Sequence, residues 1–324
     1  MSEFRSGFVS FVGRPNVGKS TLTNALVGEK IAITSAKPQT TRRAIRGIVN
    51  RESGQLILVD TPGLHRPRTL LGERLNDLVE STLSDVDVIC FCIPSNEKIG
   101  PGDAFINEQL DKYRRAKLVA IVTKSELVSR DQLAAQLLAV SELRDWTAIV
   151  PVSAIEGSQT EDLTSVLIDL LPESLALYPT DQTTDESMEQ RFCELIREAA
   201  LEGVHDELPH SLAVTIDEMG PRPNSELFDI HANVWVERDS QKGIVIGKGG
   251  SRLKDVGTTA RRGIESLLGT PVFLDLRVKV AAQCRQFGKK GRIRKGYGRG
   301  HDRLLVAGYY AAGCLRTPPS LCSG

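Results

Sequence analysis

Short apolar runs alternate with amphipathic stretches through the first half of the chain. Apolar runs of strand length lie at residues 8–12, 44–50, 56–60, 86–93, 117–122 and 148–152. Stretches that favour helix lie at residues 18–27, 70–83, 103–115, 130–144 and 161–171. Because predicted strands and helices alternate, we expect an α/β domain with a mainly parallel sheet and helices on both faces.

The alternation stops near Leu171. The next segment, LPESLALYPTDQTTDESMEQ, has two prolines and a cluster of Asp, Thr and Ser, which is typical of a linker. Beyond it, the pattern predicts helices at 187–202 and 250–268, strands at 211–218, 227–237 and 271–280, and a turn through MGPRPNSE. A further helix and a loop are expected between residues 237 and 250. We therefore expect a first domain at residues 1–173, a linker at 174–185 and an α+β module at 186–280.

The final segment, residues 281–324, is rich in glycine and arginine and then loses any pattern. Three interpretations stay open: a basic RNA-binding arm, an inert extension, or an artefact of sequence or reading frame. We expect no regular fold in this tail.

Composition is that of an ordinary globular protein, with 324 residues, 40% hydrophobic and 25% charged. No apolar run is long enough to span a membrane and the N-terminus lacks a secretory pattern, so we expect a cytoplasmic protein. The six cysteines contain no C-x-x-C pair, which argues against a zinc site or a disulfide framework. Cys90 and Cys92 alternate within one apolar run, and we expect both to pack in the core.

Positive charge is concentrated in one region although the net charge is zero. Residues 238–303 contain 17 Lys and Arg against 5 Asp and Glu, a net of +12. This imbalance favours a local site for a polyanion over general adhesion.

A phosphate-binding loop lies between the first predicted strand and helix. Residues 13–20, GRPNVGKS, match G-x-x-x-x-G-K-[ST] at each fixed position. Backbone N–H groups there can converge on phosphate oxygens, Lys19 can reach the β- and γ-phosphates, and the Ser20 hydroxyl can bind Mg²⁺. The nucleotide contacts expected in this region are Gly13, Asn16, Val17, Gly18, Lys19, Ser20 and Thr21.

Two further segments complete the expected catalytic site. Asp60 ends an apolar strand in the sequence DTPG, so its carboxylate can hold Mg²⁺ through water while the Gly63 N–H senses the γ-phosphate. Between the two motifs, PQTTR offers Thr41, or less favourably Thr40, to complete the Mg²⁺ shell. We therefore assign the catalytic roles to Lys19, Thr41, Asp60 and Gly63.

The base-recognition segment departs from its usual pattern. Guanine is commonly bound by N-K-x-D after a strand, and here the strand KLVAIV is followed by Thr123, Lys124, Ser125 and Glu126. Glu126 keeps two acceptor oxygens for guanine N1–H and N2–H₂ but is one methylene longer. A supporting loop follows the next strand at Ser153, Ala154 and Ile155, so guanine is favoured, with weakened specificity as the alternative.

A second glycine-rich loop lies in the basic region. Gly247, Lys248, Gly249 and Gly250 fit the G-x-x-G loop of a KH domain, which clamps about four nucleotides of single-stranded RNA. An apolar strand precedes the loop and a basic helix follows it. The expected RNA contacts are Arg238, Lys242, Gly247, Lys248, Gly249, Gly250, Arg252, Lys254 and Arg261.

With these motifs assembled, the chain resembles the bacterial Era family of GTPases over about residues 6–280. The segments GRPNVGKS, PQTTR, DTPG, VSAIEG and VERDSQKGIVIGKGG carry the resemblance. It implies a P-loop GTPase domain followed by a type II KH domain, with GTP or GDP and Mg²⁺ as ligands. It also implies slow hydrolysis, because Leu64 stands where other GTPases have a catalytic glutamine, and K⁺ assistance through Asn16.

The resemblance further implies binding to the 3′ region of 16S rRNA and a role in 30S ribosomal subunit assembly. It extends to peripheral association with the inner face of the cell membrane, as in some family members, and we expect a monomer. The alternative is a nucleotide-stabilised RNA-binding protein with little or no GTP turnover, which Leu64, Thr123 and Glu126 leave open.

Overall fold

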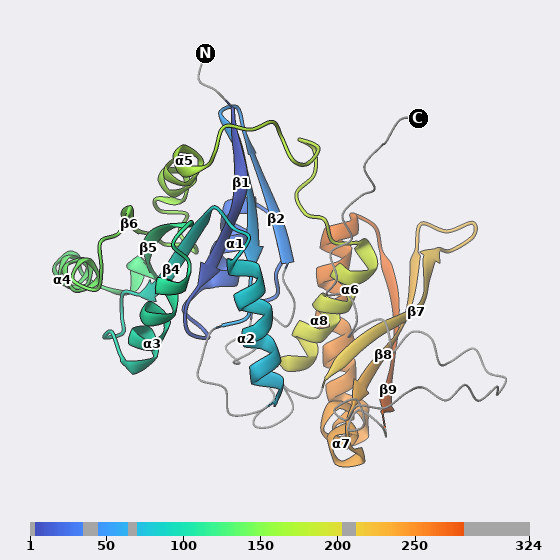
Figure 1. Cartoon of the computed structure of the whole chain (residues 1–324). Helices are drawn as coiled ribbons and strands as arrows, with labels where there is room; N and C mark the ends of the chain where they lie inside the picture. The colour runs from blue at the N-terminus through green and yellow to red at the C-terminus, as the bar shows by residue number, and fades with distance from the viewer. Residues whose placement is uncertain (1–3, 35–44, 64–69, 203–211, 282–324) are drawn as a thin grey trace, which may run out of the picture. The chain divides into compact units, whose positions relative to one another are not determined.

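A six-stranded sheet organises the N-terminal part of the chain in the computed structural model, which describes residues 4–34, 45–63, 70–202 and 212–281 (Figure 1). Its order is β2-β3-β1-β4-β5-β6, and β2 is antiparallel to β3 while the other neighbours are parallel. The strands are β1 (Arg5–Val12), β2 (Ile45–Arg51), β3 (Gly54–Asp60), β4 (Val88–Pro94), β5 (Lys117–Thr123) and β6 (Ala148–Pro151).

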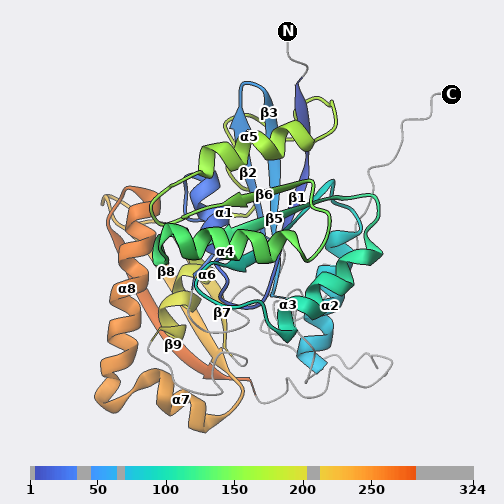
Figure 2. The same cartoon turned by 90° about the vertical axis from the view of Figure 1, so that its left-hand side faces the viewer.

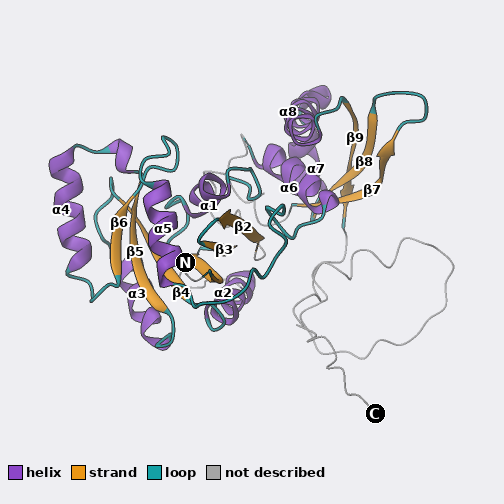
Figure 3. Cartoon of the chain, turned by 90° about the horizontal axis from the view of Figure 1, so that it is seen from above, coloured by secondary structure: helices purple, strands orange, loops and turns teal. Residues whose placement is uncertain are grey.

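Helices cover both faces of this sheet (Figure 3). One face packs against α1 (Lys19–Val27) and α5 (Thr160–Leu170). The other packs against α2 (Leu70–Leu83), α3 (Pro101–Gln109) and α4 (Arg130–Ser141). Both faces are covered, which explains why the central strands are continuous apolar runs, such as the fully buried β4. The predicted α/β fold is confirmed.

The carboxyl ends of the parallel strands share one edge of the sheet. Loops leave this edge after β1, β3, β5 and β6, and these loops contain the four nucleotide motifs found in the sequence. Segments separated by more than a hundred residues therefore meet at one place, as ligand sites of open α/β sheets do.

The second module is a three-stranded sheet with helices on one face (Figure 2). The strand order is β7-β8-β9, with β7 antiparallel and β9 parallel to β8. Its elements are α6 (Met188–Leu201), β7 (Ala213–Pro221), β8 (Phe228–Val236), α7 (Asp239–Ile246), a 3₁₀ turn (Lys248–Gly250), α8 (Ser251–Leu268) and β9 (Val272–Val280). Phe192 of α6, Ile230 of β8 and Ile264 of α8 are completely buried in its core.

The segment predicted as a linker makes specific contacts with the first sheet. The Ile48 N–H donates to the Thr183 carbonyl at 2.8 Å, and the Thr184 hydroxyl donates to the Arg46 carbonyl at 2.8 Å. The buried Gln55 side chain accepts from the N–H groups of Leu177 and Tyr178. The connecting chain is thus attached along β2 and β3.

Several element boundaries differ from the sequence prediction, and local contacts explain two of them. Helix α3 begins at Pro101, not residue 103, because Pro101 suits the first turn of a helix and the Asp103 carboxylate accepts a hydrogen bond from the Gly100 N–H. Strand β7 continues to Pro221, through part of the predicted turn, because Met219 and Gly220 pair with β8 beyond a bulge. A proline is tolerated there because β7 is an edge strand.

None of the described helices is long and apolar enough to cross a membrane. The chain up to Ala282 forms one compact unit. Residues 282–324 of the predicted tail lie outside the described residues.

Candidate nucleotide and RNA sites

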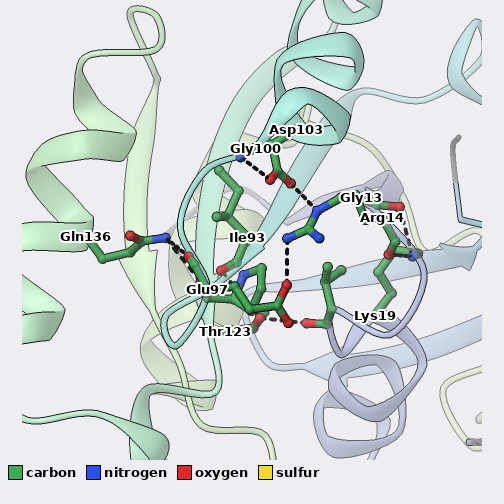
Figure 4. Close-up of polar contacts among 11 residues, drawn as sticks. Gly13, Arg14, Lys19, Ile93, Glu97, Gly100, Asp103, Thr123 and Gln136 are labelled. Carbon is green, nitrogen blue, oxygen red and sulfur yellow. Dashed lines mark hydrogen bonds and ion pairs between the residues drawn. The ribbon is translucent and has the colours of Figure 1, made fainter. Parts of the chain in front are cut away.

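The phosphate loop holds the Lys19 ammonium with its own carbonyl groups (Figure 4). Lys19 Nζ donates to the carbonyls of Arg14, at 2.9 Å, and Gly13, at 3.1 Å. Helix α1 begins at Lys19 itself, so Ser20 and Thr21 lie in its first turn, where backbone N–H groups have no partner within the helix. The arrangement places a cation beside the N-terminus of a helix, which suits a phosphate chain.

Burial makes the Lys19 charge costly in the absence of an anion. The side chain is buried, and desolvation lowers the pKa of its ammonium even though the nearby Asp60 carboxylate raises it. A phosphate group beside Nζ would stabilise the charged form, so the electrostatics of the loop favour an anionic ligand.

The two expected Mg²⁺ ligands lie side by side. The Ser20 hydroxyl donates to Asp60 Oδ2 at 2.8 Å, although Ser20 lies in the first turn of α1 and Asp60 ends β3. A hydroxyl and a carboxylate are the hard oxygen ligands that Mg²⁺ takes beside substrate phosphates. The donor set therefore fits the ion, and Thr41, the third expected ligand, lies outside the described residues.

The segment after Asp60 lies against the phosphate loop. The buried Thr61 hydroxyl donates to the Phe11 carbonyl at 3.1 Å. A Cβ on Gly63 would lie only 2.9 Å from the Pro15 nitrogen, so glycine is required for this approach. Gly63 is therefore beside the loop, where we expected it, and Leu64 lies outside the described residues.

Asn16 and Val17 form the middle of the loop. Asn16 adopts a left-handed backbone with φ of 65°, which asparagine tolerates better than most residues. Val17 is buried, and its carbonyl accepts a 2.6 Å hydrogen bond from the Thr123 hydroxyl. This contact ties the phosphate loop to the base-recognition segment at the end of β5.

The base-recognition segment is held by its backbone and by Thr123. Lys124 has a left-handed φ of 59°, and the Ser95 hydroxyl donates to its carbonyl at 2.6 Å. The Ser125 N–H donates to the Val152 carbonyl at 3.2 Å. Glu126 lies in the short 3₁₀ turn Ser125–Leu127, where its Oε2 is buried without a hydrogen-bond partner among the residues that the structure describes. A buried acceptor of this kind calls for a donor.

The supporting loop follows β6. Ser153 is buried; its N–H donates to the Ser158 carbonyl at 3.1 Å, and its hydroxyl accepts from the Glu156 N–H. Ala154 is half-buried, while the Ile155 side chain is 78% exposed. The loop is thus fixed at Ser153 and open at Ile155.

A groove lies beside the second glycine loop, between α8 and β9. It encloses about 450 Å³. Apolar and basic side chains line it together: Gly250, Leu253, Lys254, Gly257, Thr258, Arg261, Leu274 and Leu276. A Cβ on Gly249 or Gly250 would meet nothing within 4 Å, so the loop is open to an approaching nucleic-acid backbone. The groove can accept bases while Lys254 and Arg261 face phosphates.

The expected RNA residues are distributed unequally around this groove. Gly250, Lys254 and Arg261 line it, Lys248 is exposed on the glycine loop, and Arg238 is exposed at the start of α7 with Lys242 half-buried one turn later. Arg252 differs from the expectation, because its Nη2 donates to the Ala200 and Glu202 carbonyls at the end of α6. Its guanidinium satisfies a helix end, and a contact of Arg252 with RNA stays a prediction.

Two sets of residues were not found by sequence reasoning. The apolar lining of the groove, Leu253, Leu274 and Leu276, alternates on α8 and β9 like any core position and carried no separate signal. Arg14 lies within the phosphate motif at a position the motif leaves free, and its contacts with Glu97 and Asp103 join segments far apart in sequence.

Comparison with protein families matches both modules. Residues 8–124 match the family described as 50S ribosome-binding GTPase, and residues 207–283 match the KH domain family.

Curated relatives cover nearly the whole chain. The chain is 65% identical over 297 residues to GTPase Era of Mycobacterium sp. (strain KMS), which spans 90% of this chain and 99% of that protein. It is 64% identical to GTPase Era of Mycolicibacterium smegmatis, over 90% of this chain and 100% of that protein.

Two solved structures of Era proteins have a fold similar to that of this chain. A crystal structure of an Era variant from Aquifex aeolicus bound to GDP·AlF₄⁻ is 34% identical, with a TM-score of 0.81 over 86% of this chain and 95% of that chain. A crystal structure of Era in complex with MgGDPNP and nucleotides 1506–1542 of 16S ribosomal RNA is 35% identical, with the same TM-score and coverage.

Proposed function

Because the chain belongs to the Era family of GTPases, we propose that it is a GTP-controlled RNA-binding protein that acts in assembly of the 30S ribosomal subunit. The observation that carries the proposal is the presence in one chain of both sites: the Lys19, Ser20 and Asp60 cluster and the groove beside the GKGG loop. The Era relative that was crystallised with MgGDPNP and a 16S rRNA fragment supports the same pairing.

The nucleotide site binds GTP or GDP with Mg²⁺. Ser20 and Asp60 hold the ion together with Thr41, and the ion neutralises charge on the phosphates when bound. Lys19 reaches the terminal phosphates from its seat on the loop carbonyls, and the Gly63 N–H faces the γ-phosphate. These residues bind and orient the phosphate chain.

Guanine is recognised by Glu126, with Thr123, Lys124 and the loop of Ser153, Ala154 and Ile155 shaping the base site. The unpartnered Glu126 Oε2 supports this assignment, since guanine N1–H and N2–H₂ are the donors that a carboxylate would accept. Asn16 is the candidate K⁺ ligand beside the phosphate loop.

RNA binds the module of residues 186–280 through the GKGG loop and the groove. Lys248, Lys254 and Arg261 meet phosphates, while bases enter against Leu253 and Leu276. The 3′ region of 16S rRNA is the proposed target, and the protein works as a cytoplasmic monomer that visits the inner membrane surface peripherally.

Nucleotide state controls RNA access through the segments around 38–43 and 60–75, of which residues 38–43 and 64–69 lie outside the described residues. The contacts of Thr34, four residues before the first segment, with Glu198 of α6 support this route. Hydrolysis reverses the control.

Two variants test the proposal on the purified full chain. Lys19→Ala should abolish tight GTP binding and leave RNA binding in place, and Lys248→Glu should do the reverse. Titrations with GTP, ATP and XTP, and hydrolysis in K⁺ and Na⁺ buffers, complete the test. Unchanged GTP affinity of Lys19→Ala would refute the nucleotide site, and binding of GTP without turnover would favour the nucleotide-stabilised RNA-binding protein.

Arg115→Glu is the control for Lys248→Glu. It changes the net charge by the same amount at an exposed position on the first module. A loss of RNA affinity that is equal in both variants would point to general electrostatics and not to the groove.

A further inference from the structure

The Arg14 side chain joins the phosphate loop to the start of helix α3 (Figure 4). Its Nε donates to Asp103 Oδ1 at 2.8 Å, and its Nη2 donates to Glu97 Oε2 at 2.9 Å. Asp103 is completely buried, whereas the Arg14 side chain is 29% exposed. One guanidinium thus bridges two carboxylates, a geometry for which the planar fork of arginine is suited and a lysine ammonium is not.

The Asp103 carboxylate and the backbone of Glu97 are each held by a contact other than Arg14. Asp103 uses its second oxygen to accept the Gly100 N–H at 3.0 Å, which caps α3. The loop that carries Glu97 is held by Gln136 of α4, whose Nε2 donates to the carbonyls of Pro94 and Glu97 (Figure 4). The anchor for Arg14 is therefore preorganised by α3 and α4.

The aliphatic part of the Arg14 side chain also packs against helix α3. A Cβ added to Gly102 would lie 2.8 Å from Arg14 Cδ, so the arginine stem lies directly on the helix backbone. Burial opposes the guanidinium charge, but the hydrogen bonds and charges of Asp103 and Glu97 outweigh it and raise the pKa of Arg14.

The backbone of the same residue holds the nucleotide-site lysine. The Arg14 carbonyl accepts the 2.9 Å hydrogen bond from Lys19 Nζ. The side chain that is fastened to α3 and the carbonyl that orients Lys19 therefore belong to one residue, and fixing the first limits the movement of the second.

We infer that Arg14 is a positioning residue for nucleotide phosphate: by binding Asp103 and Glu97 it fastens the phosphate loop to α3 and keeps Lys19 in place. This inference rests on the proposed nucleotide site. Arg14 would act on nucleotide binding through Lys19, and helix α3 would thereby contribute to GTP affinity.

The test is a double-mutant cycle on the full chain, with GDP and a slowly hydrolysed GTP analogue as probes. Arg14→Ala should weaken binding about tenfold, the scale of a charge-assisted hydrogen bond. Asp103→Asn keeps the cap acceptor for Gly100 but loses the charge, and it should weaken binding by a similar factor. The double variant should be little worse than either single variant.

Arg14→Lys should recover part of the affinity, because it keeps one ion pair. Arg51→Ala is the matched control. Arg51 ends β2, and its guanidinium makes a two-point ion pair with Glu161 of α5. The expected result is unchanged nucleotide affinity. Melting temperature, measured for each variant, separates lost folding from lost positioning.

Three results would overturn the inference: wild-type affinity in Arg14→Ala, additive losses in the cycle, or an equal loss in Arg51→Ala. The proposed nucleotide site fails differently, through unchanged GTP affinity in Lys19→Ala. The two failures are therefore distinguishable in one set of titrations.

Discussion

At the scale of single residues, the base-recognition segment departs from the N-K-x-D pattern at Thr123 and Glu126, and the two departures have separate consequences. Thr123 supplies a hydroxyl that bonds the Val17 carbonyl at 2.6 Å, so the connection between this segment and the phosphate loop does not require an asparagine. Glu126 keeps a carboxylate, with one buried oxygen that lacks a hydrogen-bond partner among the described residues. Thr123 thus has a structural role, and the proposed role of Glu126 is to bind the base.

Replacement of Glu126 by glutamine tests this division. Glu126→Gln should weaken GTP binding about 10- to 100-fold, because hydrogen bonds to a charged acceptor contribute about 1.5–3 kcal/mol. The preference for XTP over GTP should rise at the same time, since an amide can donate to the extra xanthine oxygen.

Competitive titration of GTP and XTP measures both effects. Thr123→Val is the control, because it should weaken the two nucleotides equally. Unaltered preference in Glu126→Gln would show that another residue recognises the base.

Cysteine chemistry gives a second prediction at this scale. Burial raises the pKa of Cys92 to about 12, although Lys19 works in the opposite direction, and burial also raises the pKa of Cys90. A raised thiol pKa keeps the group neutral below that pH, so neither residue should react with iodoacetamide at pH 8 in the folded protein.

Peptide mass spectrometry checks this residue by residue, with urea-unfolded protein as the positive control. Modification of Cys90 or Cys92 in the native state would show that β4 is open to solvent.

At the scale of elements, helix α8 has two neighbouring arginines that differ in their relation to the α8–β9 groove. Arg261 lines the groove and Arg262, the next residue of α8, is exposed but does not line it. Arg261→Glu should therefore weaken binding of a single-stranded 16S rRNA 3′ oligonucleotide more strongly than Arg262→Glu.

The two variants should also differ in the salt dependence of their RNA affinity. Loss of one phosphate contact should reduce the slope of log affinity against log salt by about one in Arg261→Glu. Equal slopes in the two variants would place the RNA elsewhere on the module.

The elements also show how far sequence reasoning reaches. Helix α2 matches its predicted range of 70–83, and β3 and β5 follow apolar runs. These elements are predictable because the spacing of apolar residues within one segment indicates its secondary structure. The end of β7 at Pro221 was missed, since pairing with β8 overrides the turn propensity of Gly220 and Pro221.

Sites divide along the same line. The motifs predicted Ser20 and Asp60 as joint Mg²⁺ ligands, and the two side chains are hydrogen-bonded. The contacts of Lys19 with phosphates stay a prediction. Arg14 could not be paired with Asp103, 89 residues away, and Arg252 could not be assigned to the end of α6. Any charge can meet many partners, and only tertiary packing selects one.

At the scale of the whole molecule, α6 is tied to the end of α1 and to the chain that follows it. Glu198 accepts the Thr34 N–H at 2.9 Å and pairs with Lys30. Arg191 pairs with Glu29, whose carboxylate also accepts the Thr183 hydroxyl. Burial raises the pKa of Glu29, but these hydrogen bonds and the Arg191 charge outweigh it and hold the pKa below its ordinary value.

This connection predicts a loss of communication in Glu198→Ala. The variant should bind nucleotide and RNA separately, but the ratio of RNA affinities between the GTP-analogue and GDP states should fall toward one. Glu189→Ala, an exposed position on the same helix, is the control and should keep the wild-type ratio.

Low pH should weaken the Glu29–Arg191 pair. Because the pKa of Glu29 is depressed, its contribution to stability is full above its unfolded pKa and is lost as the pH falls through the folded pKa. Glu29→Gln should therefore remove part of the acid dependence of the melting temperature. An identical acid profile in the variant would show that the Glu29–Arg191 pair contributes nothing to it.

The most direct test of the account is the affinity of the full chain for the 3′ region of 16S rRNA, measured with Mg²⁺ and either a GTP analogue or GDP. Control of RNA access by nucleotide predicts tighter binding in the analogue state by several-fold or more, with the difference abolished in Lys19→Ala. Equal affinities in the two states would contradict that claim, even if both ligands bound tightly.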